Sequence, residues 1–181
     1  MKKEIFYIPN LLSILRILLI FPTAYLMLKG IDIYKTGIII LFFILWISDL
    51  LDGLTARKFN QVSELGKIID PVADKAAIIT FAIIIFFSGR LFLWYFILII
   101  ARDLLIATFG LFLTKKFKIT LMSNYPGKIA VLSIGIILLL SVINIELLNN
   151  KLSFLYIVST IIIIYSLIIY FKRFLQTLKN K

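Results

Sequence analysis

The sequence predicts an all-α membrane protein, a bundle of six transmembrane helices with both termini in the cytoplasm. The chain of 181 residues is 62% hydrophobic and has a mean hydropathy of +1.08, whereas a soluble domain is roughly 45–50% apolar. The excess apolar surface must face something other than water, and a lipid bilayer is the obvious candidate. This length suits one compact helical bundle, so we expect residues 1–181 to form a single membrane domain.

Six apolar stretches follow one another along the chain, each near the roughly 20 residues that a helix needs to cross a bilayer. They comprise residues 11–28, 37–54, 71–88, 91–113, 127–143 and 152–171. The first stretch follows a short basic N-terminus, and no small-residue cleavage site comes after it. We therefore interpret it as a retained first span.

The basic residues orient the predicted bundle. With six spans both ends of the chain lie on one side of the membrane, and twelve basic residues fall on that side against four on the other. The twelve are Lys2, Lys3, Arg57, Lys58, Lys67, Lys115, Lys116, Lys118, Lys172, Arg173, Lys179 and Lys181. Cytoplasmic loops carry an excess of Lys and Arg. We therefore expect a multi-pass protein of the cell (inner) membrane, with the loop after the second span in the cytoplasm.

Composition also excludes several classes of function. The formal net charge of +11 could indicate nucleic-acid binding, but the charges form short clusters between long apolar runs, as in membrane proteins. We therefore expect no nucleic-acid partner. The chain has no cysteine and no histidine, which excludes disulfides, thiolate chemistry and imidazole bases. Any metal must be held by oxygen, which favours magnesium, manganese or calcium.

An acidic cluster lies in residues 48–75. Five of the nine acidic residues of the chain fall within this stretch, and four of them lie at the ends of two predicted spans. These four are Asp49, Asp52, Asp70 and Asp74. A charge near the membrane interior is costly, so it normally faces a polar cavity and has a function.

The spacing of the cluster predicts which way its residues face. At about 100° per residue, Asp49, Asp52, Gly53 and Ala56 fall within one arc of the first helix. A similar arc of the next helix contains Gly66, Asp70, Ala73, Asp74 and Ala77. Two carboxylates from each helix can therefore meet in one site, where the small residues let a ligand or another backbone approach closely.

Four carboxylates this close could not all stay ionised unaided, because like charges oppose one another's ionisation. Two divalent cations would balance them, and paired metals suit phosphoryl chemistry. Arg57 lies one turn beyond Gly53, where its planar fork could bind a diphosphate. Helix caps and surface charges are a weaker explanation of the whole pattern. A divalent-cation transporter is a distant alternative, because its acidic residues should be distributed along a pathway.

The pattern Asp49-x2-Asp52-Gly53-x2-Ala56-Arg57-x8-Gly66-x3-Asp70-x3-Asp74 resembles the signature of the CDP-alcohol phosphotransferase family at every fixed position. The resemblance implies a phospholipid-synthesising enzyme that moves the phosphatidyl group of CDP-diacylglycerol to an alcohol, with release of CMP. It also implies two divalent cations, Mg²⁺ or Mn²⁺, and an active site that faces the cytoplasm. Homodimers are common in this family, so we expect a homodimer.

The resemblance implies a role for each residue of the motif. Asp49, Asp52 and Asp70 would be metal ligands, and Asp74 would contact the second metal and act as general base on the acceptor hydroxyl. The residues implied to hold or accommodate the CDP part of the donor are Asn10, Asp49, Gly53, Ala56, Arg57, Ser63 and Gly66.

The acceptor is predicted from residues outside the motif. Residues 8–13, 60–63 and 70–75 are similar to the phosphatidylglycerophosphate synthase and cardiolipin synthase branch of the family. Arg16, Arg102 and Lys128 could bind a phosphorylated acceptor, and glycerol 3-phosphate is our first choice.

Each of these basic residues also has an alternative interpretation. Arg16 could extend its head group to the membrane surface, Arg102 could form a structural ion pair with Asp103, and Lys128 could be interfacial. Asp103 replaces the glutamate that is usual in phosphatidylglycerophosphate synthases and is more typical of cardiolipin synthases. A cardiolipin synthase that uses phosphatidylglycerol is therefore the alternative.

Overall fold

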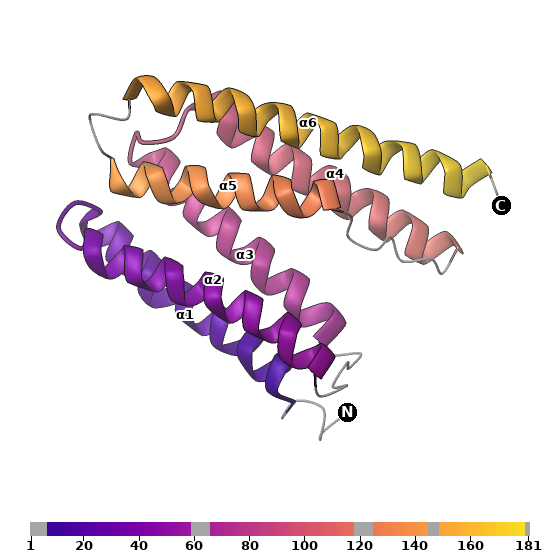
Figure 1. Ribbon diagram of the computed structural model, residues 1–181, viewed down its shortest axis with the longest axis horizontal. Coiled ribbons are helices and arrows are strands. Elements are labelled where there is room, and N and C mark those ends of the chain that lie inside the picture. Colours follow the sequence, from indigo (N-terminus) through magenta and orange to yellow (C-terminus); the bar gives the residue numbers. More distant parts are fainter. Residues whose placement is uncertain (1–6, 59–65, 118–124, 145–148, 180–181) are drawn as a thin grey trace. The chain divides into compact units, whose positions relative to one another are not determined.

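The computed structural model describes residues 7–58, 66–117, 125–144 and 149–179, and within these ranges the chain forms helices and no strands (Figure 1). The helices are α1 (Ile8–Gly30), α2 (Lys35–Lys58), α3 (Gly66–Phe87), α4 (Leu93–Phe117), α5 (Tyr125–Ile143) and α6 (Asn149–Lys179). Each predicted apolar stretch corresponds to one of these helices. The all-helical prediction is therefore confirmed for the described residues.

The third and fourth predicted stretches differ slightly from the observed helices. The third stretch runs past the end of α3 at Phe87, and the fourth stretch begins before the start of α4 at Leu93. Between them Gly89 has a φ of 75°, a left-handed conformation that glycine adopts at little cost. The Ser88 hydroxyl donates to the Ile85 carbonyl over 2.7 Å in the last turn. A glycine at the end of the helix thus sets a boundary that hydrophobicity alone does not mark.

The chain divides into two compact units, residues 1–88 and 89–181, each of which is described by itself. In the first unit α1 packs against both α2 and α3, and α1 and α2 run side by side in Figure 1. The face of α1 that this packing buries recurs every three or four residues, as a helix requires. It comprises Asn10, Ser13, Arg16, Ile20, Thr23 and Met27. The buried face of α1 is therefore polar in its first half and mostly apolar in its second.

In the second unit α6 packs against both α4 and α5. A chain of hydroxyl groups joins the three helices: the Tyr95 hydroxyl lies 2.6 Å from the Ser159 Oγ, which lies 2.8 Å from the Ser133 Oγ. Tyr95 is fully buried. Such interhelical hydrogen bonds hold apolar helices together where burial against lipid gives no driving force.

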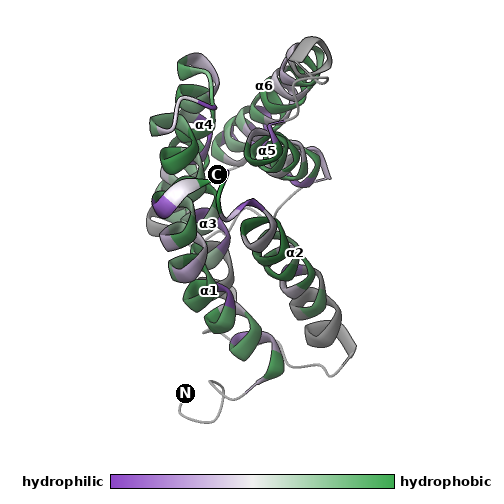
Figure 2. Ribbon diagram, turned by 90° about the vertical axis from the view of Figure 1, so that its left-hand side faces the viewer, coloured by the Kyte–Doolittle hydropathy of each residue, from purple (hydrophilic) through white to green (hydrophobic). Residues whose placement is uncertain are grey.

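Four helical segments within the described ranges are long and apolar enough to cross a membrane: Ile8–Gly30, Leu93–Gly110, Tyr125–Ile143 and Ser153–Lys179. Figure 2 shows that the helices are hydrophobic over most of their length. Large apolar side chains also point outward, for example Phe21, which is 69% exposed, and Phe87, which is 80% exposed. These features are those of a membrane protein, whose apolar outer surface faces lipid.

Candidate active site

The site begins on the polar half of the buried face of α1. Asn10, Ser13 and Arg16 are each no more than 2% exposed. Their spacing of three residues places them on successive turns of one face. The Ser13 hydroxyl donates to the Pro9 carbonyl over 3.1 Å within the same helix. Burying the Arg16 guanidinium among apolar helices would be very costly without an opposite charge beside it.

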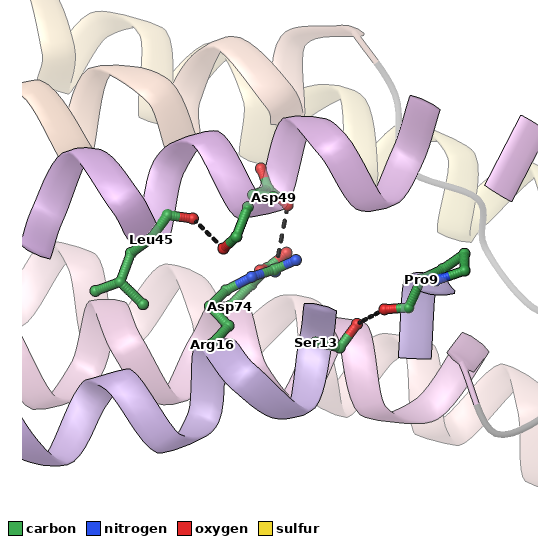
Figure 3. Close-up of polar contacts among 7 residues, drawn as sticks. Pro9, Ser13, Arg16, Leu45, Asp49 and Asp74 are labelled. Atoms are coloured by element: carbon green, nitrogen blue, oxygen red, sulfur yellow. Dashed lines mark hydrogen bonds and ion pairs between the residues drawn. The ribbon is translucent and has the colours of Figure 1, made fainter. Parts of the chain in front are cut away.

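The opposite charges come from the other two helices of the unit. Arg16 Nη1 donates to the Asp74 Oδ1 of α3, and the same nitrogen lies 3.3 Å from the Asp49 Oδ1 of α2. Figure 3 shows the three side chains pointing toward one another from three different helices. Asp49 and Asp74, which are 25 positions apart in the sequence, thus meet at one guanidinium group.

The two sides of this cluster differ in exposure. The Arg16 side chain is 3% exposed, whereas the side chains of Asp49 and Asp74 are 44% and 38% exposed. The positive charge therefore lies inside the unit, and the two carboxylates lie between it and the surroundings. A ligand that approaches from outside meets the carboxylates first.

The other residues of the acidic motif belong to the same helices. Asp52 lies three residues after Asp49 in α2, and Asp70 lies four residues before Asp74 in α3, so each occupies the neighbouring turn. The side chains of Asp52 and Asp70 lie outside the described part of the structure. The same holds for Ala56 and Arg57 in α2, and Ser63 lies between the described ranges. Gly53 lies within α2, and Gly66 is the first residue of α3.

The carboxylates that the structure does describe fit a hard divalent cation. Carboxylate oxygens are the ligands that Mg²⁺, Mn²⁺ and Ca²⁺ prefer, and Asp49 and Asp74 already face one positive charge together. Among the described side chains no group of three or more ligand residues forms. Asp52 and Asp70 would be needed to complete a site for two metals.

Two features of the first unit were not predicted from the sequence. Ser13 of α1 and Ser48 of α2 are both buried, and the Ser48 hydroxyl donates to the Leu45 carbonyl over 2.8 Å. Arg16 was expected to bind an acceptor or to extend to the membrane surface, but its buried head group contacts two carboxylates, so the second expectation is wrong. The three-residue spacing of Asn10, Ser13 and Arg16 was the available signal for this buried face.

The other two predicted acceptor residues belong to the second unit. Arg102 donates from Nη1 to the Asp103 Oδ1 over 2.5 Å and from Nη2 to the Gly127 carbonyl of α5 over 3.3 Å. Arg102 and Asp103 are 5% and 4% exposed, as in the structural ion pair that was the alternative for Arg102. Lys128, next to Gly127, is exposed.

Comparison with known proteins extends these observations to the whole chain. A sequence profile of the CDP-alcohol phosphatidyltransferase family matches residues 6–172. The CDP-diacylglycerol–glycerol-3-phosphate 3-phosphatidyltransferase of Aquifex aeolicus (strain VF5) is 36% identical over 174 residues, which cover 90% of this chain and 93% of that protein.

Two further relatives match over shorter regions. A putative cardiolipin synthase of Mycobacterium tuberculosis (strain ATCC 25618 / H37Rv) is 33% identical over 71% of this chain, but the match spans only 61% of that protein. The CDP-diacylglycerol–glycerol-3-phosphate 3-phosphatidyltransferase of Blochmanniella floridana is 36% identical over 58% of this chain and 56% of its own length. The family match over residues 6–172 and the similarity to the Aquifex aeolicus enzyme show that the chain belongs to the CDP-alcohol phosphatidyltransferase family.

Proposed function

We propose that this protein transfers the phosphatidyl group of CDP-diacylglycerol to glycerol 3-phosphate, giving phosphatidylglycerophosphate and CMP. The observation that carries the proposal is the similarity to the Aquifex aeolicus enzyme over nearly the full length of both chains. The meeting of Asp49 and Asp74 at one point of the first unit supports it, because phosphoryl transfer needs several carboxylates in one place to hold divalent metal.

The reaction is a displacement at phosphorus. The acceptor hydroxyl oxygen forms a bond to the phosphorus that carries the diacylglycerol, and the bond from that phosphorus to the bridging oxygen of CMP breaks. Asp74 accepts the hydroxyl proton, and CMP leaves. A carboxylate is a weak base at neutral pH, so much of the rate comes from holding the hydroxyl in line with the phosphorus.

Asp49, Asp52, Asp70 and Asp74 would hold two divalent cations, Mg²⁺ or Mn²⁺. Bound there, the cations would neutralise phosphate charge and lower the proton affinity of the acceptor hydroxyl. The residues proposed to hold the CDP group of the donor are Asn10, Asp49, Gly53, Arg57 and Ser63. Ala56 and Gly66 leave room for the nucleotide.

The acceptor phosphate requires cations beyond the metal site. We assign this role to Arg16 and Lys128. Arg102 contributes through the backbone, because its contact with the Gly127 carbonyl holds the first turn of α5, which carries Lys128. A cardiolipin synthase that uses phosphatidylglycerol is the second candidate. Asp103 and the similarity to the putative mycobacterial cardiolipin synthase favour it.

The same proposal includes the placement of the enzyme in the cell. Residues 1–181 form one domain whose six helices all span the cell (inner) membrane, with both termini and the active site at the cytoplasmic face. The excess of basic residues on that side supports this orientation. A homodimer is the proposed assembly.

CMP release tests the function and the acceptor together. We would supply the purified full-length protein in detergent with CDP-diacylglycerol and Mg²⁺ or Mn²⁺, and offer glycerol 3-phosphate, phosphatidylglycerol, inositol phosphate and serine in turn. We expect release with glycerol 3-phosphate and none after EDTA treatment. Release with phosphatidylglycerol alone would favour the cardiolipin synthase. If the protein showed no CMP release and no metal-dependent CMP binding, the whole proposal would be contradicted and the cation transporter would be favoured.

A further inference from the structure

Arg16 occupies a place that the proposed chemistry assigns to a cation. Its Nη1 contacts one oxygen of Asp49 and one of Asp74, and both residues are proposed metal ligands. The guanidinium lies on the buried side of the carboxylates, which are the more exposed members of the cluster. A divalent cation and Arg16 would therefore interact with the same two carboxylates, Arg16 from the buried side and the cation from the exposed side.

We propose that Arg16 is an internal counter-ion that competes with the divalent metal for Asp49 and Asp74. This inference rests on the proposed function, because it takes these aspartates as metal ligands. Without metal, Arg16 offsets their mutual repulsion and holds α2 and α3 against α1. When metal binds, the carboxylates turn their charge toward it, and the attraction of each to the guanidinium weakens.

Electrostatics predicts how Arg16 changes the affinity of the site for metal. A fixed positive charge beside the ligands lowers the affinity for a second positive charge through direct repulsion and through the contacts that must loosen. Arg16 should therefore weaken metal binding while it stabilises the metal-free protein. A phosphate-bearing substrate would offer the guanidinium a new partner, so metal and anionic substrate should bind cooperatively.

A purely structural Arg16 makes a different prediction. If its only role were to tie three helices together, removing its charge would destabilise the protein equally with and without metal. If it is a counter-ion, metal should replace the missing charge and restore most of the stability. The two cases differ in how the effect of a mutation depends on metal, which can be measured without any assay of activity.

The test compares the wild-type protein with Arg16→Gln and with Lys29→Gln. Lys29 is an exposed cation in the last turn of the same helix, about 20 Å from Arg16 along the helix axis, so its removal is a matched change of charge. The concentration of free Mn²⁺ would be measured by electron paramagnetic resonance during titrations of the purified protein in detergent. Thermal unfolding would be followed in EDTA and in saturating Mn²⁺.

We expect Arg16→Gln to lower the Mn²⁺ dissociation constant by about tenfold, since the charge removed is in direct contact with the ligands. Lys29→Gln should stay within about twofold of wild type, because an exposed charge that far away is largely screened. Arg16→Gln should also have a lower melting temperature than the wild type in EDTA. Mn²⁺ should raise the melting temperature of Arg16→Gln by more than it raises that of the wild type.

Equal or weaker Mn²⁺ binding by Arg16→Gln would overturn the counter-ion role. So would an Arg16→Gln protein that cannot be recovered folded even when saturating Mn²⁺ is present throughout purification, because metal would then be unable to replace the arginine. These failures are separate from a failure of the proposed function. Wild-type protein that binds no Mn²⁺ and releases no CMP would contradict both, whereas active wild type without the expected change in Arg16→Gln would contradict only the role of Arg16.

Discussion

Among the described side chains, each unit of the molecule buries one arginine in its interior, and the two arginines have different surroundings. Arg16 in the first unit contacts carboxylates from two other helices, and both carboxylates are more than one-third exposed. Arg102 in the second unit contacts its neighbour Asp103, which is 4% exposed, and the backbone carbonyl of Gly127. A buried cation with accessible partners can exchange them for a ligand, whereas one with enclosed partners is fixed in place.

The second pair also leaves some of its buried polar atoms unmatched. Within the described residues Arg102 Nε and Asp103 Oδ2 are buried without a hydrogen-bond partner, so the pair is not fully satisfied. Buried ion pairs often contribute little net stability, but removing one member leaves the other charge uncompensated. The pair at Arg102 should therefore respond to mutation as a structural element, and the cluster at Arg16 as part of the site.

The largest expected effect is on activity, from the accessible cluster. Asp74→Asn should lower kcat by at least about a thousandfold, because the amide can neither accept the hydroxyl proton nor supply a charged metal ligand. Metal-dependent binding of CDP-diacylglycerol should largely remain. Asp32→Asn is the matched control, since Asp32 is 66% exposed in the turn after α1, and it should leave kcat unchanged. Wild-type activity in Asp74→Asn would rule out this base.

The next effect is on stability, from the enclosed pair. Arg102→Leu should lower the free energy of unfolding by about 3–5 kcal/mol, because it leaves the Asp103 carboxylate buried and unpaired. The double variant Arg102→Leu/Asp103→Leu should recover most of this loss. Chemical unfolding in detergent would measure both. A double variant as unstable as the single one would show that the lost contact with Gly127 dominates.

A smaller effect is expected on acceptor binding. Lys128→Gln should raise the KM for glycerol 3-phosphate by about tenfold, the effect of losing one charged contact to phosphate, and leave the KM for CDP-diacylglycerol near its wild-type value. Arg102→Met should raise the same constant, and the two changes together should be less than additive because they act on one turn of α5. Equal effects on both substrates would remove Lys128 from the acceptor site and Arg102 from its positioning role.

The smallest effect concerns the hydroxyl chain of the second unit. Tyr95→Phe removes a buried hydroxyl that lies 2.6 Å from Ser159, and should cost about 0.5–1.5 kcal/mol of unfolding free energy. Tyr165→Phe is the matched control on α6, because Tyr165 is 58% exposed, and should change the unfolding free energy little. An unchanged stability in Tyr95→Phe would mean that the hydrogen bond between Tyr95 and Ser159 contributes no net stability.

The positions of the helices could be read from the sequence because length and hydrophobicity determine them. The apolar parts of the buried faces could not, because side chains that face lipid and side chains that face another helix are equally apolar. The spacing within each helix predicted that two carboxylates from each of two helices could meet, and the structure brings one from each, Asp49 and Asp74, to Arg16. Their contact with Arg16, 33 and 58 positions away in the sequence, depends on how α1 packs between α2 and α3.

The second unit illustrates the same limit of pattern reasoning. The pairing of Arg102 with Asp103 was open to prediction because the residues are adjacent. The contact with the Gly127 carbonyl could not be predicted, because every residue has a backbone carbonyl and the sequence does not indicate which one accepts a hydrogen bond. Burial of Tyr95 was also hidden, since a tyrosine near the end of a predicted span is more often an interfacial residue.

Incorporation of radiolabelled glycerol 3-phosphate into lipid tests the central claim most directly. The wild-type protein and Asp49→Asn would be incubated with CDP-diacylglycerol and Mg²⁺, and labelled lipid and CMP would be quantified in the same samples. The account predicts labelled phosphatidylglycerophosphate in equal amount to CMP from the wild type, and loss of both in Asp49→Asn and in EDTA. CMP released without labelled lipid would contradict the acceptor, and undiminished labelling by Asp49→Asn would contradict the site.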